Sequence, residues 1–329
     1  MKDALDQVKT VLAGKDYGAR LNHYYLTGES IIASDGRMTA AVPFKAPVEC
    51  VVAGEELEVV AARMPANPAL ELRTNDETGA LTLVVKAGRL RGSIACLPPD
   101  SVSFPTPPPE VARIALPGSF VAALKAVRPF IADTSVHAWG LAACVRAGRV
   151  LATNNIVLIE GLCPELELPT DAEVLIPCWA VDYILRRKDG LTHMALEDKT
   201  AASFFWSDGS WMRTQLMAGA YPPAVDRLLS EMGETPFPIE KAFRGYFQEV
   251  VSASSGIITI EPGKITGSKG VAKLECEIDL VGATEALHFN PLFIADMMQV
   301  ATEWDPSLWP APIPFRGDGV KGLIVGRKA

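Results

Sequence analysis

Apolar residues recur along the chain with the two spacings that distinguish helices from strands. Within residues 117–131, Phe120, Leu124 and Val127 are separated by four and three positions, so they share one face of a helix. Residues 149–161, RVLATNNIVLIEG, instead place two runs of aliphatic residues on either side of Asn-Asn, a pair that favours turns. The pattern predicts a helix followed by a hairpin or a tight crossing of strands.

The same succession of elements occurs three times. Each copy begins with a helical window followed by strand, turn and strand, and the helical windows are residues 2–14, 117–131 and 238–250. In the second half of each copy a short strand runs into a helix through a Gly or Pro near the helix start, at residues 48–64, 172–188 and 285–301. The first two copies then close with a further strand, turn and strand, and the third closes more irregularly. Internal repetition of this kind predicts three copies of a unit of about 110 residues.

Two turn-rich stretches separate the copies. Residues 104–110, FPTPPPE, predict a stiff linker because consecutive prolines favour extended backbone, and residues 228–238, LLSEMGETPFP, predict a second linker. We therefore predict an α+β chain of three tandem domains, each with two helices packed on antiparallel sheets. The predicted domains are residues 1–108, 109–231 and 232–329.

Composition is that of a globular protein. Of the 329 residues, 49% are hydrophobic and 21% are charged, and no apolar run approaches the roughly 18 residues that a membrane-spanning helix needs. The first residues, MKDALDQVKTVL, form an amphipathic pattern unlike a signal peptide. Six cysteines lie far apart, without a CxxC pair, which favours buried reduced thiols. We expect a cytoplasmic protein with no membrane partner.

Sequence signatures of catalysis are missing. The chain has no GxxxxGK[ST] phosphate loop, no HExxH, no GxSxG and no GxGxxG after a strand, and its four histidines are scattered. We expect no catalytic activity, no cofactor and no metal site. An enzyme with a site in a cleft between domains remains an open alternative.

Several stretches carry a resemblance to a known family. VLIPCWAVDYILRRK followed by MRTQLMAGAYPP resembles the middle domain of the bacterial sliding clamp, the beta subunit of the replicative DNA polymerase. VLATNNIVL resembles a stretch of the same domain, with Asn154 and Asn155 in place of Asp and Gly. LHFNPLFIADMM resembles the start of the third domain's second helix, and IACLPPDSVSFP the end of the first domain. The family's C-terminal tail is replaced here by GRKA, and the chain is shorter than family members usually are.

The resemblance implies a processivity factor rather than an enzyme. In this family two chains close head to tail into a six-domain ring around duplex DNA, and the ring tethers a replicative polymerase. Partners would be double-stranded DNA bound without regard to sequence, and DNA polymerase and clamp loader bound through short peptide motifs. A clamp-fold scaffold or inhibitor that does not encircle DNA is the alternative.

Charge is distributed as a DNA-lining ring would require, although weakly. Eleven basic and eleven acidic residues lie in the six helical windows, taken as residues 1–15, 53–64, 117–131, 178–189, 238–250 and 291–304, so the net charge of −8 lies outside them. The resemblance places the helices around the hole, and the candidate DNA-lining residues are Lys2, Lys9, Arg20, Lys125, Arg128, Arg186, Arg187, Lys188, Lys241 and Arg244. Phosphate contacts of this kind do not depend on base sequence. The simpler interpretation of Arg186 to Lys188 is that cations at a helix end offset its dipole, and Arg20 could be a solvated loop residue.

Two further surfaces follow from the resemblance. The positions that match the family's peptide-binding groove are Thr153, Ile156, Val157, Leu158 and Pro222. Ile156 and Val157 replace polar residues common in the family, so the groove would be more apolar than usual, although any buried strand would show the same alternation. For the homodimer, paired edge strands would join the first domain of one chain to the third domain of the other. Ile94, Val250 and Val251 match positions in that interface.

Overall fold

The computed structural model describes residues 1–14, 20–65, 67–108, 110–169, 172–187, 190–269, 272–277 and 282–327, and it does not describe the side chains of Lys241 and Ala242. These residues form two compact units, Met1–Leu116 with Arg186–Leu216 and Pro117–Leu185 with Met217–Ala329. The predicted second domain is therefore divided between the units, because its two halves join different sheets. The three domain boundaries stay predictions. No helix among the described residues is long and apolar enough to cross a membrane.

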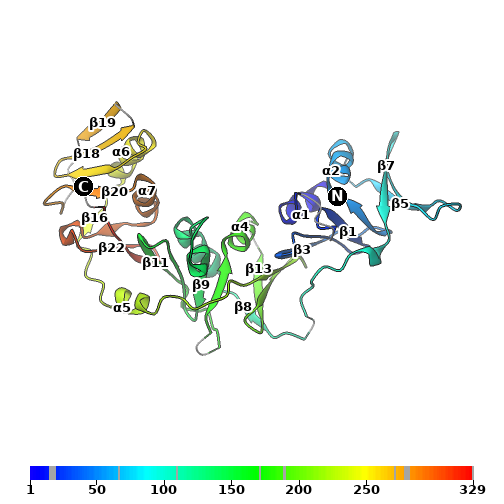
Figure 1. The fold of residues 1–329 in the computed structure, drawn as a ribbon, viewed down its shortest axis with the longest axis horizontal. Helices are drawn as coiled ribbons and strands as arrows, with labels where there is room; N and C mark the ends of the chain where they lie inside the picture. The colour runs from blue at the N-terminus through cyan, green and yellow to red at the C-terminus, as the bar shows by residue number, and fades with distance from the viewer. Residues whose placement is uncertain are drawn as a thin grey trace. The chain divides into compact units, whose positions relative to one another are not determined.

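The first unit is built on one antiparallel sheet of eleven strands, in the order β5-β6-β7-β4-β1-β2-β3-β15-β14-β13-β8. Its strands in the first copy are β1 (His23–Thr27), β2 (Ser30–Ser34), β3 (Met38–Pro43), β4 (Glu49–Ala53), β5 (Ala69–Thr74), β6 (Leu81–Ala87) and β7 (Leu90–Leu97). The second copy adds β8 (Arg113–Ala115), β13 (Leu191–Glu197), β14 (Ala201–Trp206) and β15 (Trp211–Gln215). Helix α1 (Lys2–Val8), continued by η1 (Lys9–Val11), packs on β2 and β3, and α2 (Gly54–Arg63) packs on β4 (Figure 1). A 3-10 turn, η2 (Pro99–Ser101), follows β7.

The second unit has two antiparallel sheets, in the orders β12-β9-β10-β11-β23-β22-β21-β16 and β19-β18-β17-β20. The strands of the second copy are β9 (Ala142–Arg146), β10 (Arg149–Thr153), β11 (Val157–Leu162) and β12 (Val174–Pro177). Those of the third copy are β16 (Phe237–Pro238), β17 (Ile258–Glu261), β18 (Lys264–Lys269), β19 (Ala272–Glu277), β20 (Leu287–Phe289), β21 (Glu303–Trp304), β22 (Ile313–Gly317) and β23 (Val320–Ile324). The third copy thus closes with a regular hairpin, β22–β23, although its sequence pattern is irregular.

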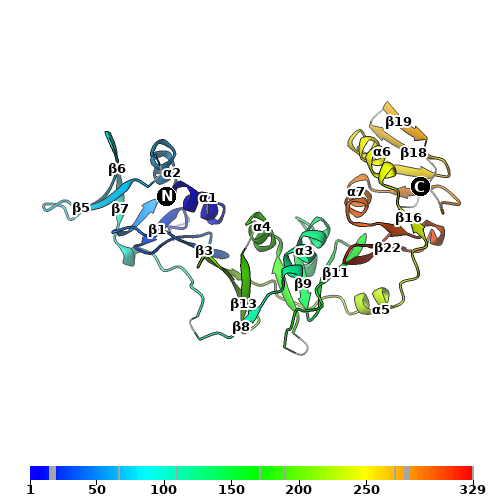
Figure 2. The same cartoon turned by 180° about the vertical axis from the view of Figure 1, so that it is seen from behind.

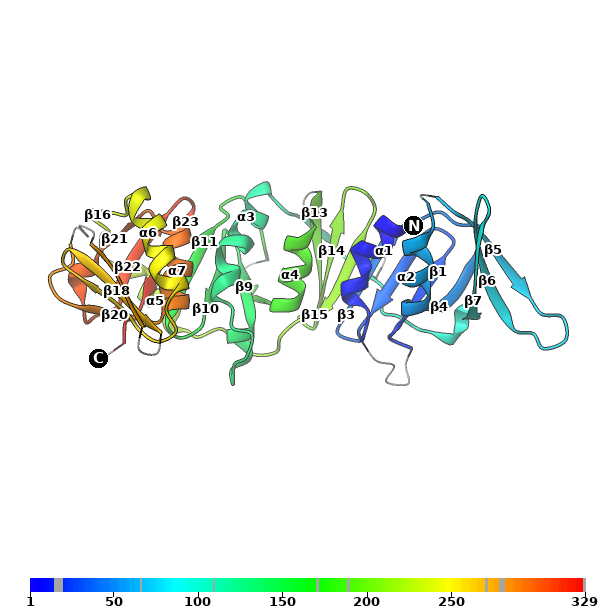
Figure 3. The ribbon, with the colours of Figure 1, turned by 90° about the horizontal axis from the view of Figure 1, so that it is seen from above.

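Helices of the second unit cover these sheets. They are α3 (Gly118–Val127), α4 (Cys178–Arg186), α5 (Ala224–Ser230), α6 (Lys241–Ser252) and α7 (Pro291–Val300), with short 3-10 turns η3 (Arg128–Phe130), η4 (Ala138–Leu141) and η5 (Pro306–Leu308). Helix α3 lies on β10 and β11 (Figure 2), and α6 lies beside α7 and on β18 and β19 (Figure 3). The predicted face of α3 is confirmed, since Phe120, Leu124 and Val127 are all fully buried. Gly161 of β11 lets α3 approach closely, because a Cβ there would lie 3.0 Å from the Cβ of Ala123.

Consecutive copies are joined in the same way in both units. In the first unit, β15 of the second copy pairs with β3 of the first copy, with Trp211 opposite Ala41 and Thr214 opposite Met38. In the second unit, β23 of the third copy pairs with β11 of the second copy, with Val320 opposite Gly161. We call each of these strand pairs a joint. In each joint the last strand of one copy extends the sheet of the copy before it.

Candidate functional site

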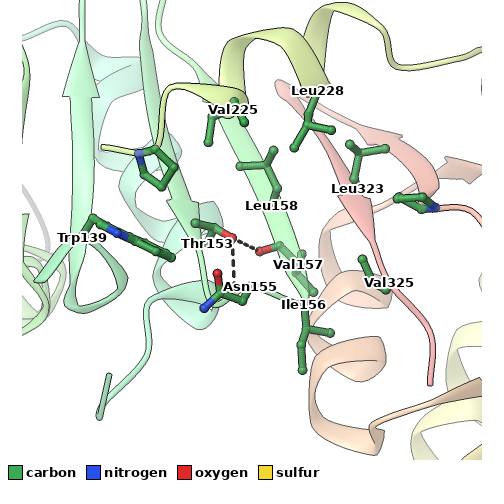
Figure 4. Close-up of a pocket in the computed structure, with 13 residues that line it drawn as sticks. Trp139, Thr153, Asn155, Ile156, Val157, Leu158, Val225, Leu228, Leu323 and Val325 are labelled. Carbon is green, nitrogen blue, oxygen red and sulfur yellow. Dashed lines mark hydrogen bonds between the residues drawn. The ribbon is translucent and has the colours of Figure 1, made fainter. Parts of the chain in front are cut away.

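An apolar groove lies where the β11–β23 joint meets α5, all within the second unit (Figure 4). The β10–β11 turn and β11 supply Thr153, Asn155, Ile156, Val157 and Leu158. Chain segments around α5 supply Pro222, Ala224, Val225 and Leu228, and the remaining lining residues are Trp139, Pro312, Leu323 and Val325. None of these side chains is charged. The groove therefore suits aliphatic or aromatic side chains, because burying their apolar surface there would favour binding.

The floor of the groove is held by turn chemistry that the sequence dictates locally. Asn154 Oδ1 accepts hydrogen bonds from the backbone N–H groups of Ile156 at 3.0 Å and Val157 at 2.8 Å. Thr153 Oγ1 donates to the Val157 carbonyl oxygen at 2.8 Å and accepts from the Asn155 N–H at 3.2 Å. Side-chain bonds of this type fix a turn without neighbouring secondary structure. The Asn-Asn turn predicted from the sequence thus presents Ile156 and Val157 in one defined orientation.

All five residues predicted for a groove line this one: Thr153, Ile156, Val157, Leu158 and Pro222. Val157 is fully buried and Leu158 is 7% exposed, so both also behave as the buried strand residues of the simpler interpretation. Sequence reasoning missed Trp139, Asn155 and the apolar side of α5. Helix α5 begins at Ala224 and ends at Ser230, so it overlaps the linker predicted from residue 228. Its apolar residues Val225, Leu228 and Leu229 are spaced as on a short amphipathic helix, and that signal could have identified it.

A chain of alternating charges ties α5 and β23 to the sheet behind the groove. Asp226 of α5 lies 2.8 Å from an Arg146 guanidinium nitrogen and 2.6 Å from an Arg149 nitrogen. Arg146 also contacts Glu173 at 2.6 Å, and Glu173 Oε1 accepts from the Tyr221 N–H at 2.6 Å. At the other end, the buried Glu160 lies 3.6 Å from Arg149 and 3.0 Å from Lys321 Nζ of β23. Three walls of the groove are thus linked by one ionic network.

Removing Asp226 should loosen α5. Partial burial raises the pKa of Asp226, but Arg149 and Arg146 outweigh that effect and hold the pKa below its usual range. A lowered pKa means that the charged carboxylate stabilises the fold. This contribution is fully present at pH values above the usual pKa of aspartate, and it is lost as the pH falls through the lowered pKa. Because the side chain is 49% exposed, we expect Asp226→Asn to cost about 0.5–1 kcal/mol at pH 7. Urea unfolding of both proteins measures this, and the difference should shrink in acid; a difference that is constant down to pH 2 would contradict it.

Many of the predicted DNA-lining cations are engaged within the chain. Lys9 Nζ contacts Asp6 at 2.6 Å, and Arg128 binds Asp182 of α4 through two bonds, at 2.5 and 2.9 Å. Arg244 donates to the carbonyl oxygen of Ala301, where α7 ends. Such groups have part of their hydrogen-bonding capacity already used, so they are weaker candidates for phosphate contact.

The basic cluster that ends α4 separates into residues of different kinds. Arg187 is 10% exposed in its side chain, binds Asp208 at 2.8 Å and places its guanidinium 4.7 Å from the centre of the Trp206 ring. The prediction that Arg187 contacts DNA is therefore not supported by its surroundings, because stacking and ion pairing bury it. Arg186 is exposed, and Lys188 lies outside the described residues.

The remaining candidates differ in exposure. Lys2 of α1, Lys125 of α3 and Arg186 of α4 are exposed, and none has an ion pair among the described residues. Arg186 lies within electrostatic range of Lys9: Asp6 raises the pKa of Lys9, and Arg186 acts against that rise. Arg20 is half-buried in its loop, and the side chain of Lys241 is outside the described part of the chain.

Side chains predicted for the dimer interface are mostly turned inward. Ile94 of β7 is 3% exposed and Val250 of α6 is 1% exposed, whereas Val251 is half-buried. Ile94 and Val250 therefore have almost no side-chain surface to offer to a partner in this conformation. Both lie in elements next to an open strand edge, so the interface itself stays a prediction.

The cysteines and the possible metal ligands of the described residues are further candidates for a site. Four of the six cysteines are buried, as predicted, whereas Cys178 and Cys276 are half-buried. Within the described ranges no group of three His, Cys, Asp or Glu residues is arranged to hold a metal ion.

Comparison with known proteins identifies the fold. No family model and no curated protein sequence matches the chain. Among solved structures, the sliding clamp of Pseudomonas aeruginosa bound to griselimycin matches with a TM-score of 0.81 and 17% identity, over 100% of this chain and 97% of that one. The Helicobacter pylori beta clamp bound to a DNA ligase peptide matches with a TM-score of 0.77 and 18% identity, over 100% and 97% of the two chains. The Caulobacter crescentus clamp matches with a TM-score of 0.78 and 19% identity, over 99% of this chain and 97% of that one. At these identities the likeness establishes the architecture, and the chain has the fold of the bacterial sliding clamps.

Proposed function

We propose that the protein is a divergent DNA sliding clamp: two chains close into a six-domain ring around duplex DNA, and the groove holds peptide segments of a polymerase and a clamp loader. The observation that carries this proposal is the repeated joint. Copies one and two are joined through β3 and β15, and copies two and three through β11 and β23. The same rule applied once more requires β19 of one chain to pair with β7 of another.

Both strands of this third joint are open on the side that it needs. Strand β19 is the terminal strand of its sheet, and every described residue in it is exposed except the half-exposed Cys276. Strand β7 pairs with β4 only at Cys96 and Leu97, which leaves residues 90–95 unpaired along that edge. An unpaired strand edge of this kind is a ready template for pairing with another strand. Every chain carries both a β7 edge and a β19 edge. In the proposed ring, β7 of each chain therefore pairs with β19 of the other, which gives two equal interfaces.

The register of the third joint follows from the strand pairs within each copy. Ala87 pairs with Leu90 across a two-residue turn as Gly317 pairs with Val320, so Arg91 corresponds to Lys321. On the other strand, Glu275 corresponds to Glu160, since their hairpin partners Thr266 and Leu151 occupy equivalent positions. Glu160 and Lys321 face each other in the existing joint. In the ring, Arg91 would therefore lie opposite Glu275 of the second chain.

Peptide docking is supported by the uncharged groove and by one neighbour in structure, the H. pylori clamp bound to a DNA ligase peptide. DNA contact would rest on the exposed cations Lys2, Lys125 and Arg186, with weaker help from the engaged ones. A sparse lining suits sliding, because many close phosphate contacts would hold the ring in place. The likeness to sliding clamps supports a non-catalytic role, which we place in the cytoplasm, with ring opening driven by a separate loader.

Light scattering and DNA trapping test the proposal. The protein should have twice the mass of one chain at micromolar concentration. When it is loaded on nicked circular DNA by a bacterial clamp loader and ATP, it should stay bound in high salt and be released when the circle is cut. A monomer at that concentration would favour the alternative of a clamp-fold scaffold or inhibitor. A dimer that is retained equally on linear and circular DNA would contradict encirclement.

A further inference from the structure

Polar groups are scarce in the groove, and they differ in what they can still bind. Among the described residues that line it, only Thr153, Asn155 and Trp139 carry side-chain donors or acceptors. The Thr153 hydroxyl is used in both directions, as donor to the Val157 carbonyl and as acceptor from the Asn155 N–H. Trp139 has one N–H group, which donates and cannot accept. Asn155 has both a donor and an acceptor.

The Asn155 side chain is exposed, and its carboxamide makes no hydrogen bond to the described residues. Its backbone has a φ of +69°, in the left-handed region that asparagine tolerates better than most residues. The turn bonds of Thr153 and Asn154 on either side hold that backbone in place. Figure 4 shows the carboxamide beside Thr153, on the side of the groove where Trp139 lies. The backbone of Asn155 is thus fixed by the turn, whereas its carboxamide is free to bind a ligand.

A peptide that enters an apolar groove loses water from its main chain as well as from its side chains. An amide group left without a partner there costs about 1–3 kcal/mol. The lining side chains offer one unused acceptor, the Asn155 oxygen, and its nitrogen can donate at the same time.

We propose that Asn155 anchors and orients the bound segment in the groove by pairing with its main chain. The Asn155 Oδ1 accepts from a peptide N–H, and Nδ2 donates to a peptide carbonyl oxygen. The occupant is an extended, uncharged segment whose leucine or aromatic side chains fill the apolar floor. At the residue beside Asn155, its backbone N–H and carbonyl groups are free to form hydrogen bonds. The inference rests on the proposed peptide-docking function.

The test is a thermodynamic cycle measured by calorimetry. The probe is a blocked, uncharged hexapeptide with two leucines and a phenylalanine, together with single N-methylated forms that each lack one N–H. The variant is Asn155→Gly, which removes the carboxamide and suits the positive φ, so its melting temperature should not fall. We expect about tenfold weaker binding by N155G, and one N-methylation that weakens native binding about tenfold but leaves N155G unaffected.

A second variant separates the two halves of the carboxamide. Asn155→Asp keeps the acceptor and loses the donor, so it should remain sensitive to the same N-methylation. Asn154→Gly is the control for the turn: it removes the bonds to Ile156 and Val157, and it should lower the melting temperature as well as the affinity. If the native protein binds the peptides and N155G binds them equally, with no N-methylation that distinguishes the two, the role of Asn155 is overturned. If the native protein binds none of them, the docking function fails and the inference fails with it.

Discussion

The Arg91→Glu protein should be a monomer at concentrations where the native protein is a dimer, and adding Glu275→Arg should restore the dimer. In the proposed third joint Arg91 would face Glu275 of the second chain across antiparallel strands, as Lys321 faces Glu160 at 3.0 Å within the chain. Like charges directly opposite each other destabilise a strand pair and suppress association. Because the proposed ring would contain this contact twice, we expect the dissociation constant to rise at least about 100-fold in the single variant. Sedimentation velocity over a range of concentrations measures it.

A matched control lies on the same hairpin. Arg89 belongs to the two-residue turn and has no partner in the proposed register, so Arg89→Glu changes the net charge equally and should leave the dimer intact. If R91E and R89E weaken the dimer to the same extent, overall charge is responsible and the register is wrong. If R91E dissociates the dimer and E275R does not restore it, strand β7 is at the interface but Glu275 is not its partner.

Local patterns predicted those parts of the fold that neighbouring residues decide. Phe120, Leu124 and Val127 define one face of α3 by spacing alone, and the structure buries all three. The Asn-Asn turn is equally local, since Asn154 bonds to the residues immediately after it. The repeated order of elements then predicted the α+β architecture, which the structure confirms.

Properties that depend on contacts between distant residues could not be predicted in this way. Arg187 and Arg186 are adjacent cations in the sequence, yet only Arg187 meets Trp206 and Asp208 across the sheet. Helix α5, which forms the wall of the groove opposite β11, is held by ion pairs from Asp226 to Arg146 and Arg149. These two arginines lie about 80 residues earlier in the chain, far outside any local sequence pattern. Five groove positions were predicted through resemblance to a family, and Asn155 was not among them although it lies in the same turn.

The groove also depends on a close approach at the β11–β23 joint, and Gly322→Ala should disrupt it. A Cβ at Gly322 would lie 2.3 Å from the carbonyl oxygen of Leu158 and 2.4 Å from Cζ of the buried Phe315. Neither neighbour can move easily, since one is backbone and the other is a fully buried ring. We expect a loss of about 3 kcal/mol in the free energy of unfolding, at the upper end of the usual cost of overpacking. Leu158 and Leu323 line the groove on either side of this contact, so peptide binding should be lost as well.

The same chemical change should have the opposite effect at Gly245. This residue is exposed within α6, and nothing lies within 4 Å of a Cβ built there. Glycine inside a helix costs about 0.5–1 kcal/mol relative to alanine, so Gly245→Ala should stabilise the protein by about that amount and leave peptide binding unchanged. Urea unfolding and peptide titration of the two variants compare one added methyl group in two settings. Equal stability of G322A and the native protein would show that the joint can widen without loss, and the groove would then not depend on the packing of β23 against β11.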